Sequence, residues 1–492
     1  AIAFSGIAGV DPQVGLFGAF CLSVTIAFVG GRMGMITSAT GSTALLMTGI
    51  VATGVTNGQT LGLDEVTSKT LGLSYLIAAG LLTGVFQILW GYLRLAYQMR
   101  FVPQGVLSGF VNALALLIFQ AQFEQLGFDD HYGDFFGPIK GQITTVWILV
   151  IFGLLIIYGL PRLTRLIPSQ LIAIIVLTAI TIWFNLDIPT VSDLGKLPTG
   201  LPSLGLPFGS FSEGKVPFSL ETFGLVLPTA LAISLVGLME TFLTQDIIDD
   251  MTDTNSNKNK EARGQGIANF ISSLFGGMAG CALVGQSVMN TDNGGRTRLS
   301  TLSSGLCLLA MIILCKPYLE QIPMAALVAV MITIAISTAD TIGLKNIVKI
   351  PRSDTAVMLM TFSVTMLTTP HNLALGVIAG VALAGILFSR KVAKVIRVNV
   401  QSSNENEVIY EVVGQLFFVS KIYFLQGFDI YNHPGKVIIN MSKAHIWDQS
   451  GVSALDQIIR KISSGGSNVE VIGLNKESLD LFERLGGQDS SH

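Results

Sequence analysis

Long apolar segments separated by short polar ones dominate the first four fifths of the chain. Several approach the ~20 residues that an α-helix needs to cross the hydrocarbon core of a membrane. The stretch AIAFSGIAG is apolar but shorter, and it predicts the tail of a truncated first helix. With that fragment, about fourteen spans are predicted. The others are expected near residues 14–30, 36–52, 71–91, 106–122, 144–160, 167–186, 223–243, 264–277, 281–290, 300–316, 323–338, 355–369 and 372–389.

The pattern changes near residue 398. The segments EVIYEVVG, GKVIINM and NVEVIGL predict strands, while SGVSALDQIIRKI and KESLDLFERLG predict amphipathic helices, so a small α/β domain is expected. The two series of seven spans predict two repeats, over about residues 1–186 and 220–390. The expected domains are a transmembrane domain at 1–390, a basic linker at 391–397 and the α/β domain at 398–492.

The composition agrees with a polytopic membrane protein. Of 492 residues, 50% are hydrophobic and 12% charged, and the mean hydropathy is +0.62. An ordinary soluble protein has about 25% charged residues, so a soluble enzyme of ordinary composition is excluded. The net charge of -3 and the lack of a basic tract rich in aromatic residues give no sign of a nucleic-acid partner. The histidines show no metal spacing, and neither an enzyme nor a covalent cofactor is expected.

The cysteines lie in or beside apolar stretches. No loop spacing among them suggests a disulfide framework or a zinc site. We interpret them as small buried hydrophobic residues. They are Cys21, Cys281, Cys307 and Cys315.

Lysine and arginine gather in alternate loops, which predicts the orientation. One set of loops carries most of them, including Arg32, Arg94 and Arg263. Cytoplasmic loops of membrane proteins hold the excess of basic residues, so this set is expected inside the cell. Arg390 and Lys391 follow the last span and place the α/β domain in the cytoplasm as well. The predicted location is the plasma membrane, in contact with its lipid.

Two short segments interrupted by glycine stand at corresponding places in the two repeats. They are GGRMGMITSATGSTALL at 30–46 and FGGMAGCALVGQSVMN at 275–290. Such segments in matching positions indicate the midplane binding site of a transporter. The N-termini of half-helices there would present unpaired N–H groups, which favour an anion. The alternative is that the small residues only let helices pack closely.

An acidic residue, Glu240, stands in the apolar segment LPTALAISLVGLMETFLTQD. A carboxylate inside a span is costly and by default indicates a function. Thr244 follows four residues later, on the same helix face, so the pair could bind Na⁺, or Glu240 alone could carry a proton. The alternative is that Glu240 reaches the cytoplasmic interface, because Asp246, Asp249 and Asp250 follow. In the α/β domain, Ser450 stands at a plausible helix N-cap.

The motifs IAGVDPQVGLFGAF, SATG, METFLTQD, ARGQGIANFISSLFGG, GGRTRLST and NMSKAHIWDQSGVSALD resemble those of the SulP anion transporter family, the sulfate permeases and their relatives. The resemblance covers essentially the whole chain. It implies a fourteen-helix inverted repeat of seven plus seven, with core and gate domains. It also implies a cytoplasmic STAS domain, a homodimer and an elevator-like movement of the core.

The resemblance also implies the site residues. The anion is expected between two half-helix starts, with Phe4 lining the pocket. A coupling Na⁺ is expected at Glu240 and Thr244, with the backbone around Ala282, and Ser450 matches a position phosphorylated in stand-alone STAS proteins. The expected anion-binding residues are Phe4, Ser38, Ala39, Thr40, Gly41, Leu283, Val284, Gly285 and Gln286.

Three positions depart from the bicarbonate-transporting members of the family or from other relatives. Glu240 replaces an Asp of the sodium-dependent bicarbonate transporters, and Val284 stands where they have a Thr. Gln286 replaces a basic residue that many relatives carry. The leading hypothesis is sodium-coupled uptake of bicarbonate. The alternatives are proton-coupled uptake of sulfate or a dicarboxylate, an anion channel, and a receptor that does not transport.

Overall fold

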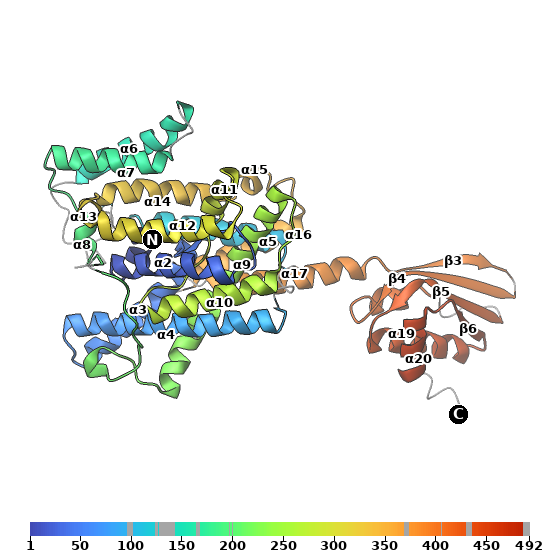
Figure 1. Ribbon diagram of the computed structural model, residues 1–492. Coiled ribbons are helices and arrows are strands. Elements are labelled where there is room, and N and C mark those ends of the chain that lie inside the picture. The colour runs from blue at the N-terminus through green and yellow to red at the C-terminus, as the bar shows by residue number, and fades with distance from the viewer. Residues whose placement is uncertain are drawn as a thin grey trace. The chain divides into compact units, whose positions relative to one another are not determined.

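The computed structural model describes the chain except for residues 96–101, 124–125, 127–142, 164–167, 196, 199, 369–372, 405, 430–434 and 486–492. The chain divides into two units, residues 1–381 and 382–492. Figure 1 shows that helices build the first unit and that the second contains a small sheet. The predicted fold class, a helical membrane part followed by a small α/β domain, is confirmed.

The helices of the first unit follow the apolar segments along the chain. The first series comprises α1 (Ile2–Ile7), α2 (Pro12–Val29), α3 (Gly41–Thr60), α4 (Glu65–Tyr92), α5 (Gln104–Gln120), α6 (Ile143–Gly159), η3 (Leu160–Arg162), α7 (Ser169–Trp183) and α8 (Val191–Leu194). The second series comprises η4 (Phe211–Glu213), α9 (Leu220–Thr252), α10 (Lys258–Leu274), α11 (Val284–Asp292), α12 (Arg298–Leu314), α13 (Lys316–Glu320), α14 (Met324–Thr338), α15 (Thr341–Lys345), α16 (Arg352–Leu367) and α17 (Leu373–Ala393). Within the described residues, 5 helices are long and apolar enough to cross a membrane.

The predicted spans near 36–52 and 281–290 begin too early. Residues Thr37–Ser38 form strand β1 and residues Cys281–Ala282 form strand β2, and these pair in a two-stranded antiparallel ribbon. The helices start only after the ribbon, because the strand residues are extended and cannot join the helical hydrogen bonding. α3 then continues to Thr60, beyond the predicted end.

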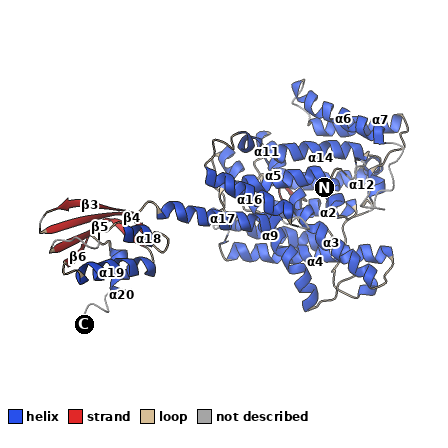
Figure 2. Ribbon diagram, turned by 180° about the vertical axis from the view of Figure 1, so that it is seen from behind, coloured by secondary structure: helices blue, strands red, loops and turns tan. Residues whose placement is uncertain are grey.

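Close helix packing in the first unit depends on glycine. α4 and α10 cross where Gly84 meets Gly266, and a Cβ on Gly84 would stand 2.7 Å from the Gly266 carbonyl oxygen. Glycines therefore let these two helices approach closely at this crossing. Elsewhere in the unit, α6, α7 and α14 lie near one another (Figures 1 and 2). They share a cluster of buried apolar side chains.

The second unit contains a four-stranded sheet in the order β3-β4-β5-β6. β3 pairs antiparallel with β4, while the β4–β5 and β5–β6 pairs are parallel. Figure 2 shows the helices of the unit packed beside the sheet, and the core lies between them. The elements are β3 (Arg397–Ser403), β4 (Glu407–Leu416), α18 (Lys421–Gln426), β5 (Lys436–Ile446), α19 (Gln449–Ser464), β6 (Asn468–Ile472) and α20 (Lys476–Leu485).

Two details of this unit differ from the sequence prediction. β3 was not predicted, because it is mostly exposed and lacks apolar alternation. α18 was not predicted either; it is only 6 residues long. Ser450 is not the N-cap of α19. That position belongs to Asp448, whose side chain accepts a hydrogen bond from the Gly451 N–H at 2.8 Å, and Ser450 is the second residue of the helix.

Candidate functional site

The β1–β2 ribbon brings the two interrupted segments together. Thr37 pairs with Ala282, and Ser38 pairs with Cys281. α3 and α11 begin within a few residues of this ribbon, so both N-terminal ends lie beside it. The backbones approach closely because residue 280 is glycine, where a Cβ would collide with the carbonyl oxygen of Ser38.

The start of α3 is held by hydroxyl groups. Thr40 is the N-cap, and Thr40 and Thr43 form a reciprocal capping box. Gly41 follows in a tight space, where a Cβ would stand 3.2 Å from Cε1 of Phe4 and 2.7 Å from Cδ1 of Ile118. The buried Phe4 ring therefore packs against the first turn of α3.

The start of α11 is more open. Leu283 occupies the N-cap position without a side-chain cap, while Gly285 and Gln286 are exposed. The first N–H groups of an α-helix have no acceptor inside the helix, so those of α11 can bind an anion. The segment is anchored by Ser287, whose Oγ accepts a hydrogen bond from the Ile36 N–H at 2.9 Å.

Glu240 of α9 reaches the same place. The Sγ of Cys281 donates a hydrogen bond to Oε2 of Glu240 at 2.7 Å. The hydroxyl groups of Thr40 and Ser42 lie close to this carboxylate as well, and Thr40 Oγ1 is 3.3 Å from Cys281 Sγ. The carboxylate thus contacts β2 and the first turn of α3, beside the two helix starts.

Thr244, on the same helix, contacts backbone oxygen atoms of α9 and of β2. Its Oγ1 donates to the carbonyl oxygen of Glu240 at 2.8 Å and lies 3.4 Å from that of Ala282. The structure therefore brings together the residues expected at the cation site. Oxygen atoms from a carboxylate, a hydroxyl and a carbonyl suit a hard cation such as Na⁺. Ser450 belongs to the other unit and takes no part in this group.

A polar stripe on α10 supports the ribbon, and the sequence analysis missed it. Asn269 accepts from the Gly280 N–H at 2.8 Å and donates to the Gly280 carbonyl at 3.1 Å. Gln265 donates to Thr37 Oγ1 at 2.8 Å, and Glu261 accepts from the Gly31 N–H at 2.6 Å. These residues are spaced four apart, which places them on one helix face. Polar residues at a spacing of four, in a segment flanked by predicted spans, were the sequence signal that could have revealed this stripe.

The interpretation of the cysteines as buried hydrophobic residues is wrong for two of them. Cys21 and Cys281 are buried, but Cys307 is exposed and Cys315 is partly exposed. Cys281 also acts as a hydrogen-bond donor to Glu240 rather than as an inert apolar side chain. Its position beside Ser38 in the ribbon could not be read from the apolar run around it.

Comparisons with known proteins place this geometry in a family. The sulfate permease family profile matches residues 1–361, and the STAS domain profile matches residues 397–492. The chain is 42% identical over 487 residues to the putative sulfate transporter YbaR of Bacillus subtilis, covering 99% of this chain and 93% of that protein. It is 28% identical over 417 residues to the bicarbonate transporter BicA of a Picosynechococcus species, covering 82% and 70% respectively.

Solved structures agree with these matches. The overall structure of SLC26A9 superposes with a TM-score of 0.79 at 16% identity, over 98% of this chain and 83% of that one. The transmembrane domain of a cyanobacterial BicA superposes with a TM-score of 0.63 at 26% identity, over 78% and 92%. The family profile spans most of the chain, and the helical fold is shared. The chain therefore belongs to the sulfate permease family of anion transporters and carries a STAS domain at its C-terminal end.

Proposed function

We propose that this protein takes up a small inorganic anion across the plasma membrane as a secondary active transporter. The observation that carries the proposal is the β1–β2 ribbon, which sets the N-terminal ends of α3 and α11 beside the Glu240 carboxylate. Helix dipoles and free N–H groups would replace part of the water around the anion. A cation bound nearby would offset the charge of the anion and couple the movement of the anion to an ion gradient.

Bicarbonate with Na⁺ is the substrate pair that we favour. Glu240, Thr244 and the Ala282 carbonyl supply the oxygen atoms for Na⁺, and one relative is named a bicarbonate transporter. The core that carries the site would move in an elevator-like manner within a homodimer. By the positive-inside rule the STAS domain lies in the cytoplasm.

Proton-coupled sulfate uptake is the second candidate. The relative with 42% identity is named a putative sulfate transporter, and Val284 offers no hydroxyl group beside the site. Glu240 is a carboxylate within a membrane helix, and such carboxylates mark proton relays in pumps and transporters. The anion would bind in the same place, but Glu240 would carry the coupling proton.

Uptake by proteoliposomes separates the two candidates. Labelled bicarbonate and labelled sulfate are each offered with an inward sodium gradient and with an inward proton gradient. Bicarbonate uptake that requires sodium supports the first candidate, and sulfate uptake driven by protons supports the second. A current far above carrier turnover would indicate a channel instead, and ligand binding without flux would indicate a receptor.

Glu240→Gln tests the coupling residue in the same assay. The variant keeps the size of the side chain but loses its negative charge, so gradient-driven uptake should be abolished. Glu221→Gln is the matched control, because Glu221 is an exposed residue in the first turn of the same helix. Gradient-driven uptake retained by Glu240→Gln at the level of this control would refute the role of Glu240.

A further inference from the structure

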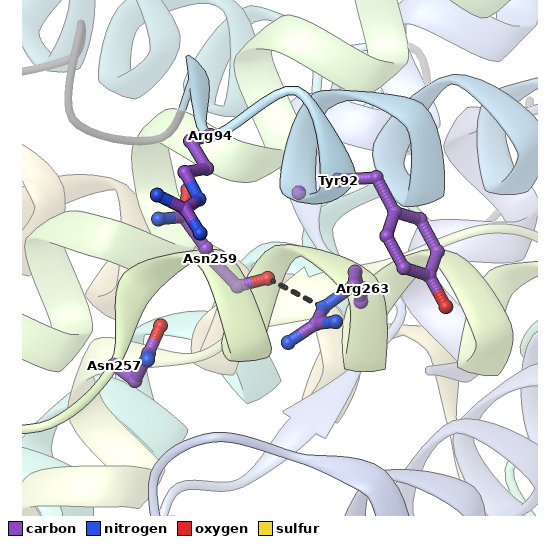
Figure 3. A pocket seen from close by; sticks show the side chains of 6 residues that line it. Tyr92, Arg94, Asn257, Asn259 and Arg263 are labelled. Carbon is purple, nitrogen blue, oxygen red and sulfur yellow. Dashed lines mark hydrogen bonds between the residues drawn. The ribbon is translucent and has the colours of Figure 1, made fainter.

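A polar pocket of about 350 Å³ lies at the end of α4 and the beginning of α10, away from the ribbon site. Figure 3 shows the side chains of Arg94, Asn257 and Arg263 around one open space. This volume is near the lower end of the range for small-molecule sites. Its lining residues are Gly91, Tyr92, Arg94, Asn257, Asn259 and Arg263, which include two arginines and no carboxylate.

The two helices form this pocket because Gly91 lets them approach. A Cβ on Gly91 would stand 2.7 Å from the backbone carbonyl oxygen of Asn259 and 3.0 Å from the backbone nitrogen of Arg263. α4 ends at Tyr92, and Arg94 then adopts a φ of 57°, a value uncommon for residues other than glycine. This turn carries the Arg94 side chain to the rim of the pocket (Figure 3).

The Arg263 guanidinium is held in place by neutral groups. It lies 5.0 Å from the centre of the Tyr92 ring, and its Nε donates to the Asn259 carbonyl oxygen at 3.4 Å. A cation stacked on an aromatic ring keeps its full charge. Its terminal nitrogens therefore remain available to a ligand while the side chain is already ordered.

Two other basic residues of the same predicted cytoplasmic loops are already paired with carboxylates. Arg32 pairs with Asp249 at 3.1 Å, and Lys258 pairs with Asp246 at 2.7 Å. Within the described part of the chain, neither Arg94 nor Arg263 pairs with a carboxylate. The pocket therefore has an uncompensated positive charge, and positive charge in a concave site attracts anions.

The pocket also has one unsatisfied acceptor. Oδ1 of Asn259 is buried and has no hydrogen-bond partner within the described residues, and the side chain is only 8% exposed. A buried acceptor without a partner is costly, so a donor from a ligand would relieve it. The complementary ligand combines an anionic group for the arginines with a hydroxyl group for Asn259.

We propose that this pocket binds a phosphate group that has a neighbouring hydroxyl. Guanidinium groups bind phosphate oxygens in a bidentate manner. Basic pockets between membrane helices on the cytoplasmic side bind the headgroups of anionic lipids. Phosphatidylglycerol carries both the phosphate and the hydroxyl groups, and free hydrogen phosphate offers the same chemistry from solution. The proposal is independent of the transported anion and of the coupling ion.

The test uses the purified full-length protein in detergent. Its thermal unfolding is followed while phosphatidylcholine, phosphatidylglycerol or sodium phosphate is titrated. Arg94→Gln is the main variant, because this exposed side chain can be changed without disturbing packing, and Arg263→Gln is the second. Arg296→Gln, also exposed and in the same predicted cytoplasmic set, is the matched control.

We expect phosphatidylglycerol, but not phosphatidylcholine, to stabilise the native protein and the control. Loss of a charge-assisted hydrogen bond should weaken the apparent affinity about tenfold or more in the pocket variants. Stabilisation by sodium phosphate alone, lost in Arg94→Gln, would support the pocket and assign a soluble source. An effect of equal size in Arg94→Gln and Arg296→Gln, or no preference for the anionic lipid and no response to phosphate, would overturn the proposal.

Discussion

Asn269→Ala should loosen the binding site without breaking the helix that carries Asn269. The side chain is fully buried. It links α10 to Gly280, the residue before β2, and to Gln87 of α4. It accepts from the Gly280 N–H at 2.8 Å, donates to the Gly280 carbonyl at 3.1 Å and donates to Gln87 Oε1 at 2.8 Å. Alanine favours helix, so α10 itself should remain intact.

The cost follows from the three groups left without a partner. Hydrogen bonds between membrane helices average about 0.6 kcal/mol, whereas an unsatisfied buried group costs about 1 kcal/mol or more. Three hydrogen bonds at the first value give about 2 kcal/mol, and three unsatisfied groups at the second give about 3 kcal/mol. The residue before β2 loses both of its anchors, so the ribbon and the start of α11 should become less well positioned. We therefore expect both a lower unfolding midpoint and weaker anion binding.

Two assays measure these effects on the same preparations. Thermal unfolding in detergent reports the stability, and the concentration dependence of labelled anion uptake reports the apparent affinity. Asn293→Ala is the control, because Asn293 is exposed and its side chain makes one hydrogen bond within the described residues, to the Met289 carbonyl. If Asn269→Ala matches Asn293→Ala in both assays, the polar stripe of α10 does not support the site and the reasoning fails.

Three further variants test other features of the structure. Gly84→Ala forces a Cβ against the backbone of α10 and should lower the stability by about 1 to 3 kcal/mol in thermal unfolding, whereas Gly224→Ala, which faces open space, should have little effect. Asp448→Ala removes the cap of α19 and should increase proteolysis of the STAS domain, at a cost of about 1 kcal/mol, while Ser450→Ala should not. Cys281→Ala removes the hydrogen-bond donor to the Glu240 carboxylate and, on the proposed role of Glu240, should reduce gradient-driven uptake about tenfold. Cys281→Ser should retain most of that uptake; equal uptake by the two variants would argue against the hydrogen bond.

Hydropathy predicted most of the membrane helices because burial in lipid leaves long apolar runs in the sequence. The same signal failed at the starts of α3 and α11. A two-residue strand such as Thr37–Ser38 is too short for any periodic pattern, and its partner at Cys281–Ala282 is set by tertiary packing. The glycine-interrupted segments still marked where the two backbones meet, because close backbone approach requires residues without a Cβ.

The sequence predicted which residues are candidates for the cation site, but not the side chains that surround them. Glu240 and Thr244 are adjacent on one helix face, so their proximity follows from helix geometry alone. The contact between Glu240 and Cys281 joins two segments that no local pattern connects. The same holds for the pocket at Arg94 and Arg263, since positive charge in loops predicts orientation but not which side chains remain unpaired.

The ribbon also constrains how the protein is made. Thr40 and Cys281 touch at the site although 241 residues separate them in the chain. At about 5 to 20 residues per second, the ribosome needs about 12 to 50 seconds to synthesise the intervening segment. During that time the first repeat sits in the membrane with the polar start of α3 unmatched. Nascent chains that stop before β2 should therefore lack anion binding and become clients of membrane chaperones or proteases.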